Sequence, residues 1–160
     1  MPQELEQLND AGAWQDILRN VSCEVLETMF FADAQPVGCE HSWMNDALSA
    51  RVAFNGSHVG FMVLAASHDA AASIAAAFLG SESGEMAEVE EGEVILELSN
   101  ILCGALLSRL WPESSLLLEA PQLVNAELNA VGPLHCCFAL EEGNLSISVQ
   151  WSEPSERAQV

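Results

Sequence analysis

Residues 93–110 form the segment that most restricts how this chain can fold. Apolar side chains recur there every three or four residues, which is the spacing of one face of an α-helix. A helix with so broad an apolar face has to pack against a core. The residues of that face are Val94, Ile95, Leu98, Ile101, Leu102, Ala105 and Leu106.

The other side of this helix is a narrow polar stripe. Its members follow one another at steps of three and four residues, so they share one face. They are Glu93, Glu97, Asn100, Gly104 and Ser108. We expect Glu97 and Asn100 to stand together and point away from the core, a carboxylate beside a carboxamide. The small residues next to them favour close approach by another molecule.

The charge of the chain excludes two classes of partner. Its 160 residues carry 24 acidic and four basic side chains, which gives a net charge of −20, and no residue is lysine. Nucleic acids are bound through clustered cations that meet their phosphates, so we predict no nucleic-acid partner. Anionic membrane surfaces are disfavoured for the same reason, and no apolar run approaches the roughly 20 residues of a membrane span. We therefore predict no membrane partner.

The cysteines and the polar N-terminus favour a cytoplasmic location. The chain begins with an acidic segment that has no apolar signal region. The cysteine number is odd, and we expect free thiols that act as small hydrophobes in a reducing compartment. The five are Cys23, Cys39, Cys103, Cys136 and Cys137. A zinc site from His135, Cys136 and Cys137 is disfavoured, because adjacent residues of a strand point to opposite faces.

Helices and strands alternate along the chain. Amphipathic or alanine-rich patterns predict helices over 3–9, 12–31, 69–79 and 85–110. A hairpin is predicted over 48–64 around an Asn55-Gly56 turn, and a second one over 134–151. Single strands are expected near 36–42 and 116–119, and less clearly within 121–131.

This order predicts an α+β fold in one domain. A helix, a strand and a hairpin occur in 12–64 and again in 93–151, which indicates a pseudo-twofold α-β-β-β repeat. Strands arranged in hairpins favour a mostly antiparallel, six-stranded sheet with the long helices packed on one face. We expect a single domain over 1–160 with flexible termini at 1–11 and 152–160.

The sequence Glu97-Leu-Ser-Asn100 resembles the Glu-x-x-Asn motif of the CheC/CheX/FliY phosphatases of bacterial chemotaxis. Segment 25–31 is similar to the first helix of CheX-type domains, and the hairpins and alanine-rich helix come in the family's order. The resemblance covers roughly residues 12–151 and is closest to the single-site CheX-like branch. CheC-type relatives repeat the motif on the first helix, where this chain has Phe30 in place of the asparagine.

The resemblance implies a phosphatase that accelerates hydrolysis of the aspartyl phosphate of a CheY-type response regulator, in chemotaxis or related two-component signalling. Asn100 would orient the attacking water, since a carboxamide both accepts and donates hydrogen bonds. Glu97 would dock a lysine of the regulator, while Glu93, Gly104 and Ser108 would contact the same partner. The resemblance further implies no cofactor in this chain, magnesium on the regulator, and a homodimer formed through the sheets.

Two alternatives stay open at this point. The chain could be a non-catalytic CheC-like binding module that recognises a receiver domain or another signalling protein. It could also be a small-molecule enzyme with Glu97 as its base, which requires a deep pocket around that side chain.

Overall fold

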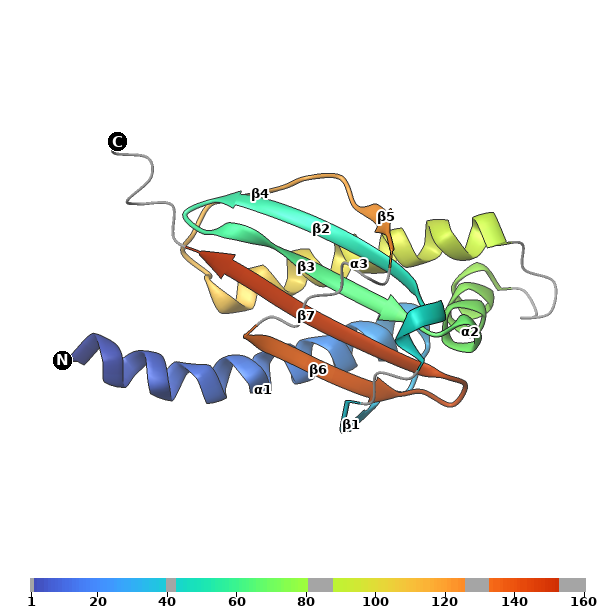
Figure 1. Cartoon of the computed structure of the whole chain (residues 1–160), viewed down its shortest axis with the longest axis horizontal. Helices are drawn as coiled ribbons and strands as arrows, with labels where there is room; N and C mark the ends of the chain where they lie inside the picture. The colour runs from blue at the N-terminus through green and yellow to red at the C-terminus, as the bar shows by residue number, and fades with distance from the viewer. Residues whose placement is uncertain (1, 40–42, 81–87, 126–132, 153–160) are drawn as a thin grey trace.

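The computed structural model describes residues 2–39, 43–80, 88–125 and 133–152, with side chains described from residue 12 onward except at residues 45 and 88. Figure 1 shows an antiparallel sheet with α1 (Pro2–Phe30) and α3 (Glu88–Leu110) on one of its faces and α2 (His68–Leu79) at one end. The predicted α+β class is confirmed. Of the elements and termini expected above, residues 40–42, 85–87, 126–131 and 153–160 lie outside the described ranges.

The sheet has seven strands in the described part of the chain, one more than predicted. They are β1 (Gln35–Val37), β2 (Leu48–Gly56), β3 (Val59–Ala66), β4 (Leu116–Leu118), β5 (Gln122–Val124), β6 (Leu134–Ala139) and β7 (Asn144–Ser152), and the short 3₁₀ helix η1 (Met44–Asp46) precedes β2. The additional strand is β5, which pairs antiparallel with β2 beyond the stretch that β4 occupies. The sequence expects this strand only loosely, within 121–131, because three residues are too few to define its bounds by alternation.

The strand order carries the predicted repeat. It reads β1-β6-β7-β3-β2-β4, so the hairpin of each half lies beside the single strand of the other half. Exchanging the two halves turns the order into its own reverse, as a pseudo-twofold axis between β3 and β7 requires. The two halves are therefore interlocked within one sheet.

The core lies between the sheet and the helices. Strand residues that face the helices alternate with residues on the outer face, for example Val52, Phe54, Met62 and Leu64, all of which are buried in one cluster. The aromatic rings of Trp14, Trp111 and Trp151 close one end of this core with centroids 5.4–6.2 Å apart.

Two local expectations are corrected by the structure. The helices predicted over 3–9 and 12–31 form the single helix α1. The turn predicted at Asn55-Gly56 lies instead at residues 57–58, because Asn55 and Gly56 still belong to β2 and Phe54 pairs with Gly60. Pairing of β4 with Asn55 and Gly56 extends β2 past the residues that usually turn a hairpin.

The end of α1 depends on an unusual backbone conformation. Phe31 has a positive φ of 56°, and the amide of Ala32 donates to the Leu26 carbonyl at 2.9 Å, which closes the helix. The Phe30 ring, just before this bend, is fully buried and stacks on Phe78 with centroids 4.8 Å apart. The Phe31 side chain is 73% exposed.

Two of the five cysteines are not free thiols. Cys39 and Cys137 form a disulfide with their Cα atoms 5.3 Å apart, whereas Cys23, Cys103 and Cys136 are free. The expectation of free cysteines is therefore wrong for this pair, which is 98 residues apart in the sequence. Only the pairing of β1 with β6 brings Cys39 and Cys137 together.

Phe30 and Phe31 differ so sharply in burial that the same substitution should separate them. Phe30→Asn leaves a cavity and a buried amide, so we expect it to lower the free energy of unfolding by more than about 3 kcal/mol. Phe31→Asn replaces an exposed ring in a left-handed conformation that asparagine tolerates well, and should stay within about 1 kcal/mol of the wild type. Urea unfolding of both variants measures this. Equal losses would contradict the placement of the two rings.

Candidate functional site

The polar stripe lies on the outside of α3, as the sequence predicts. Glu93, Glu97 and Asn100 are exposed, whereas Leu98, between the last two, is fully buried. Ser99 is also fully buried, and its hydroxyl donates to the Ile95 carbonyl at 2.8 Å. Ser99 therefore faces inward, where the helix backbone accepts the hydrogen bond of its hydroxyl. Glu97 and Asn100 lie on the opposite side of the helix.

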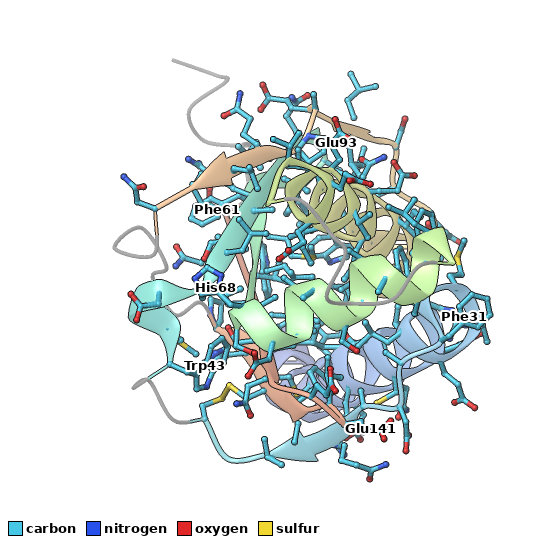
Figure 2. The ribbon with its side chains drawn as sticks, turned by 90° about the vertical axis from the view of Figure 1, so that its right-hand side faces the viewer. Phe31, Trp43, Phe61, His68, Glu93 and Glu141 are labelled. Atoms are coloured by element: carbon cyan, nitrogen blue, oxygen red, sulfur yellow. A yellow bond between two sulfur atoms is a disulfide. The ribbon has the colours of Figure 1, made fainter. Side chains whose placement is uncertain are left out.

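The side chains of Glu97 and Asn100 make no hydrogen bond or ion pair with any other described residue of this chain. Both side chains project from a helix that is held on its inner face by buried residues such as Leu102 and Leu106. Figure 2 shows Glu93 at the outer surface beside α3. The acceptor and donor groups of the pair are thus directed outward from a firmly packed element.

The C-terminal half of the stripe consists of small residues that line a hollow. A Cβ atom added to Gly104 would meet nothing within 4 Å, so packing in this chain does not require glycine there. The Ser108 hydroxyl donates to the Gly104 carbonyl at 2.9 Å. These two residues line a hollow of about 220 Å³ together with Trp111 and Leu118. Another molecule can approach α3 closely at this point.

The helix is anchored to α1 beyond its apolar contacts. Arg109, in the last turn of α3, has a guanidinium nitrogen 3.4 Å from a carboxylate oxygen of Glu24 on α1. Both side chains are largely exposed, so this ion pair contributes little to stability. Orientation of α3 is set mainly by its buried face.

Within the described part of the chain, Glu97 and Asn100 lie on the exposed side of α3. Two hollows, of about 530 and 440 Å³, lie on the outer face of the sheet and beside β1 and β6. Glu97 and Asn100 line neither of them. The arrangement on α3 suits a macromolecular partner better than an enclosed small molecule.

On α1, the position that corresponds to Asn100 carries no carboxamide. Glu27 is exposed, but Phe30, three residues later, is in the core. Of these two corresponding helix positions, α3 alone presents an exposed glutamate and asparagine three residues apart.

Two features define the class of this protein. The first is an open antiparallel sheet with a pseudo-twofold strand order, and the second is a long helix on that sheet that presents a carboxylate and a carboxamide outward. The profile of the family described as chemotaxis phosphatase CheX matches residues 48–136, which is more than half of the chain, and the chain belongs to this family. The family was suspected from the motif, and that prediction is confirmed. No curated protein matches the chain.

Solved structures share the fold at low sequence identity. The chemotaxis protein CheX from Vibrio vulnificus superposes with a TM-score of 0.70 at 18% identity, covering 87% of this chain and 96% of its own. CheX in a CheX–CheY–BeF₃–Mg²⁺ complex from Borrelia burgdorferi gives 0.66 at 16% identity, with 86% and 97% covered. FliY from Thermotoga maritima gives 0.57 at 16% identity, with 94% and 90% covered.

The structure also brings together residues that the sequence did not connect. The sulfur atoms of Cys39 and Cys137 and the ring nitrogens of His135 lie within 4.8 Å of one another. The spacing of His135 and Cys137 shows that they share one face of a strand, but nothing in the sequence assigns Cys39 to the same place. Cys136 points into the core instead.

Gly104 offers a test of how open the stripe is. Gly104→Ala adds a methyl group into free space in a helix interior, so we expect the free energy of unfolding to rise by about 1 kcal/mol. Gly92→Ala is the matched control on the same helix, because its new Cβ would stand 3.3 Å from Leu123 Cδ1 and should gain less. Urea unfolding compares the two. A destabilised Gly104→Ala variant would show that the stripe is closed by this chain.

Proposed function

We propose that this chain accelerates hydrolysis of the aspartyl phosphate on a CheY-type response regulator. The observation that carries the proposal is the exposure of Glu97 and Asn100 one turn apart on a well-packed helix, in a chain of the chemotaxis phosphatase CheX family. The Borrelia burgdorferi structure, in which a CheX protein is in complex with CheY, supports the choice of partner.

Asn100 is proposed to orient the water. In the reaction, water attacks phosphorus, the bond to the aspartyl oxygen breaks, and inorganic phosphate leaves a free carboxylate on the regulator. Catalysis of phosphoryl transfer depends mostly on positioning and electrostatics. The carboxamide oxygen can accept from the water while its NH₂ donates to an anionic phosphoryl oxygen. A carboxylate in that position would repel the same oxygens.

Glu97 is proposed to fix the docking register. Its carboxylate is exposed and engages no described residue of its own chain, so it is available to a cation of the partner. The lysine near the phosphorylated aspartate of the regulator is the cation that we assign to it. Glu93, Gly104 and Ser108 extend the contact along α3, where the glycine allows the partner's backbone to come close.

Magnesium is proposed to belong to the regulator. The metal-capable group in the described part of this chain consists of two sulfur atoms and an imidazole. Mg²⁺ prefers oxygen ligands in octahedral geometry, so this group does not suit it. Catalysis by this chain would then rest on Asn100 and on docking, with no cofactor of its own.

The homodimer implied by the family resemblance stays a prediction. The outer face of the sheet includes a hollow of about 530 Å³ lined by residues such as Arg51, Phe61 and Gln150. Arg51 there stacks its guanidinium 4.2 Å from the centroid of the Phe61 ring. A second copy would meet a mixed apolar and polar surface at this face, on the side of the sheet away from α3.

Asn100→Ala should remove most of the rate acceleration and leave folding unchanged, because the side chain is exposed and supports no contact. We expect phosphate release from a phosphorylated receiver domain to slow by about 100-fold relative to the wild type. Asn100→Asp, nearly equal in size, should be as slow because of charge repulsion. Glu90→Gln, exposed on the same helix, is the control and should keep full activity. An active Asn100→Ala variant would contradict the assignment. If the wild type binds the receiver without speeding phosphate release, the chain is the non-catalytic binding module.

Glu97→Gln should mainly weaken association. Loss of an exposed charge pair at a docking surface is expected to raise the dissociation constant for the receiver by about 3- to 10-fold and to reduce its dependence on salt. At saturating receiver, the rate of phosphate release should approach that of the wild type. Titration by calorimetry at low and high ionic strength measures the first effect. Unaltered affinity at both salt concentrations would rule out the docking role.

A further inference from the structure

Three side chains with metal-binding atoms meet at the β1 edge of the sheet. A ring nitrogen of His135, Nε2, lies 3.7 Å from Cys39 Sγ and 3.7 Å from Cys137 Sγ. His135 Nδ1 is 3.8 Å from Cys39 Sγ. The imidazole thus faces both sulfur atoms of the disulfide at once, and Figure 2 shows that disulfide next to Trp43.

The strand pairing explains why the three meet. Val37, the last residue of β1, pairs with Cys137 of β6, and Cys39 follows two residues later with its Cα atom 5.3 Å from that of Cys137. His135 and Cys137 are two residues apart, so their side chains leave β6 on the same face. Cys136 between them belongs to the core cluster, which identifies the face of the other two as the outer one. The arrangement is built into the sheet.

The spacing suits a tetrahedral metal ion. With Zn–S bonds of about 2.3 Å and Zn–N bonds of about 2.0–2.1 Å, a sulfur and a nitrogen on one zinc ion stand roughly 3.6 Å apart. The observed sulfur–nitrogen distances of 3.7–3.8 Å are close to this value. Only the two sulfur atoms have to move apart, and Cys39, which is exposed and follows the end of β1, has room to do so.

The site is reachable from solvent. Cys137 is buried, His135 is half-buried and Cys39 is exposed, so a metal ion would enter from the side of Cys39. A hollow of about 440 Å³, lined by Cys39, Cys137 and Trp43 among others, opens at this point. The strongly negative charge of the whole chain also raises the local concentration of cations.

We infer that the reduced chain binds a single Zn²⁺ ion through Cys39, His135 and Cys137, and that the disulfide is the oxidised, metal-free state of the same site. A dithiol reductant supplies two electrons and two protons to the disulfide and becomes a disulfide itself. Zn²⁺ then displaces the two thiol protons to solvent and leaves its fourth position for water. In the other direction, a low-molecular-weight disulfide accepts the two electrons from the two thiolates, takes two protons from solvent and becomes two thiols, while the protein disulfide forms and the metal is released.

The inference is independent of the proposed phosphatase activity. The cluster lies on the outer face of the sheet, whereas α3 covers the inner face. Either claim can therefore fail without the other.

Metal titration of the reduced full chain tests the inference. The protein is reduced with a phosphine under argon and titrated with Co²⁺, whose thiolate ligation gives charge-transfer absorption, and then with Zn²⁺ against a chromophoric chelator. We expect saturation at a single ion per chain, and no binding by the oxidised protein. Cys39→Ser, Cys137→Ser and His135→Ala should each weaken binding by at least about 100-fold, since even loss of a supporting hydrogen bond costs 10- to 100-fold.

Two matched variants serve as controls. Cys136→Ser alters the adjacent cysteine on the opposite face of β6, and His68→Ala alters an exposed histidine at the start of α2. Both should bind the metal like the wild type. Failure of the reduced wild type to bind, binding that persists in His135→Ala, or binding lost equally in Cys136→Ser would each overturn the site. Circular dichroism of every variant confirms that it is folded before titration.

Discussion

The pairing of β3 with β7 is the interaction on which the rest of the structure depends. Eight consecutive residue pairs, from Val59 with Ser152 to Ala66 with Leu145, join the two halves of the chain. This pairing forms the centre of the sheet, and the core-facing side chains of both strands, such as Leu64 and Ile147, are fully buried. Without it, each half would be a helix and a hairpin with too little apolar surface to fold alone.

The two halves of the chain interlock on either side of the β3–β7 pair. Each hairpin offers its free edge to the single strand of the other half, so β1 lies on β6 and β4 lies on β2. The β1–β6 contact makes the Cys39–His135–Cys137 cluster, and the β2–β3 hairpin supports α3 from below. Both candidate sites are therefore products of the same strand exchange, on opposite faces of one sheet. A side chain on such a support needs little further ordering when a partner binds.

Most of what could be predicted from the sequence followed from the periodicity of its apolar residues. A helix of 23 residues with an apolar face has only one way to bury itself, so the exposure of Glu97 and Asn100 followed from spacing alone. The predictions that were wrong or imprecise concern features that depend on pairing between residues far apart in the sequence. The turn moved to residues 57–58 because β4 extends β2, and β5 is too short to show a period. Cys39 acquires its neighbours only through a register across 98 residues, which no local pattern encodes.

The two long helices carry different residues at the corresponding position. On α1, the position three residues after Glu27 is Phe30, whose ring fills the core against Phe78 of α2. On α3, the position three residues after Glu97 is Asn100, which contributes nothing to the described core. A buried aromatic at Phe30 stabilises the fold by several kcal/mol, on the order of what its removal costs. An exposed carboxamide contributes little, so stability does not explain Asn100. The proposed contact with a response regulator would explain it, and this asymmetry is the physical reason to look for the proposed activity on α3.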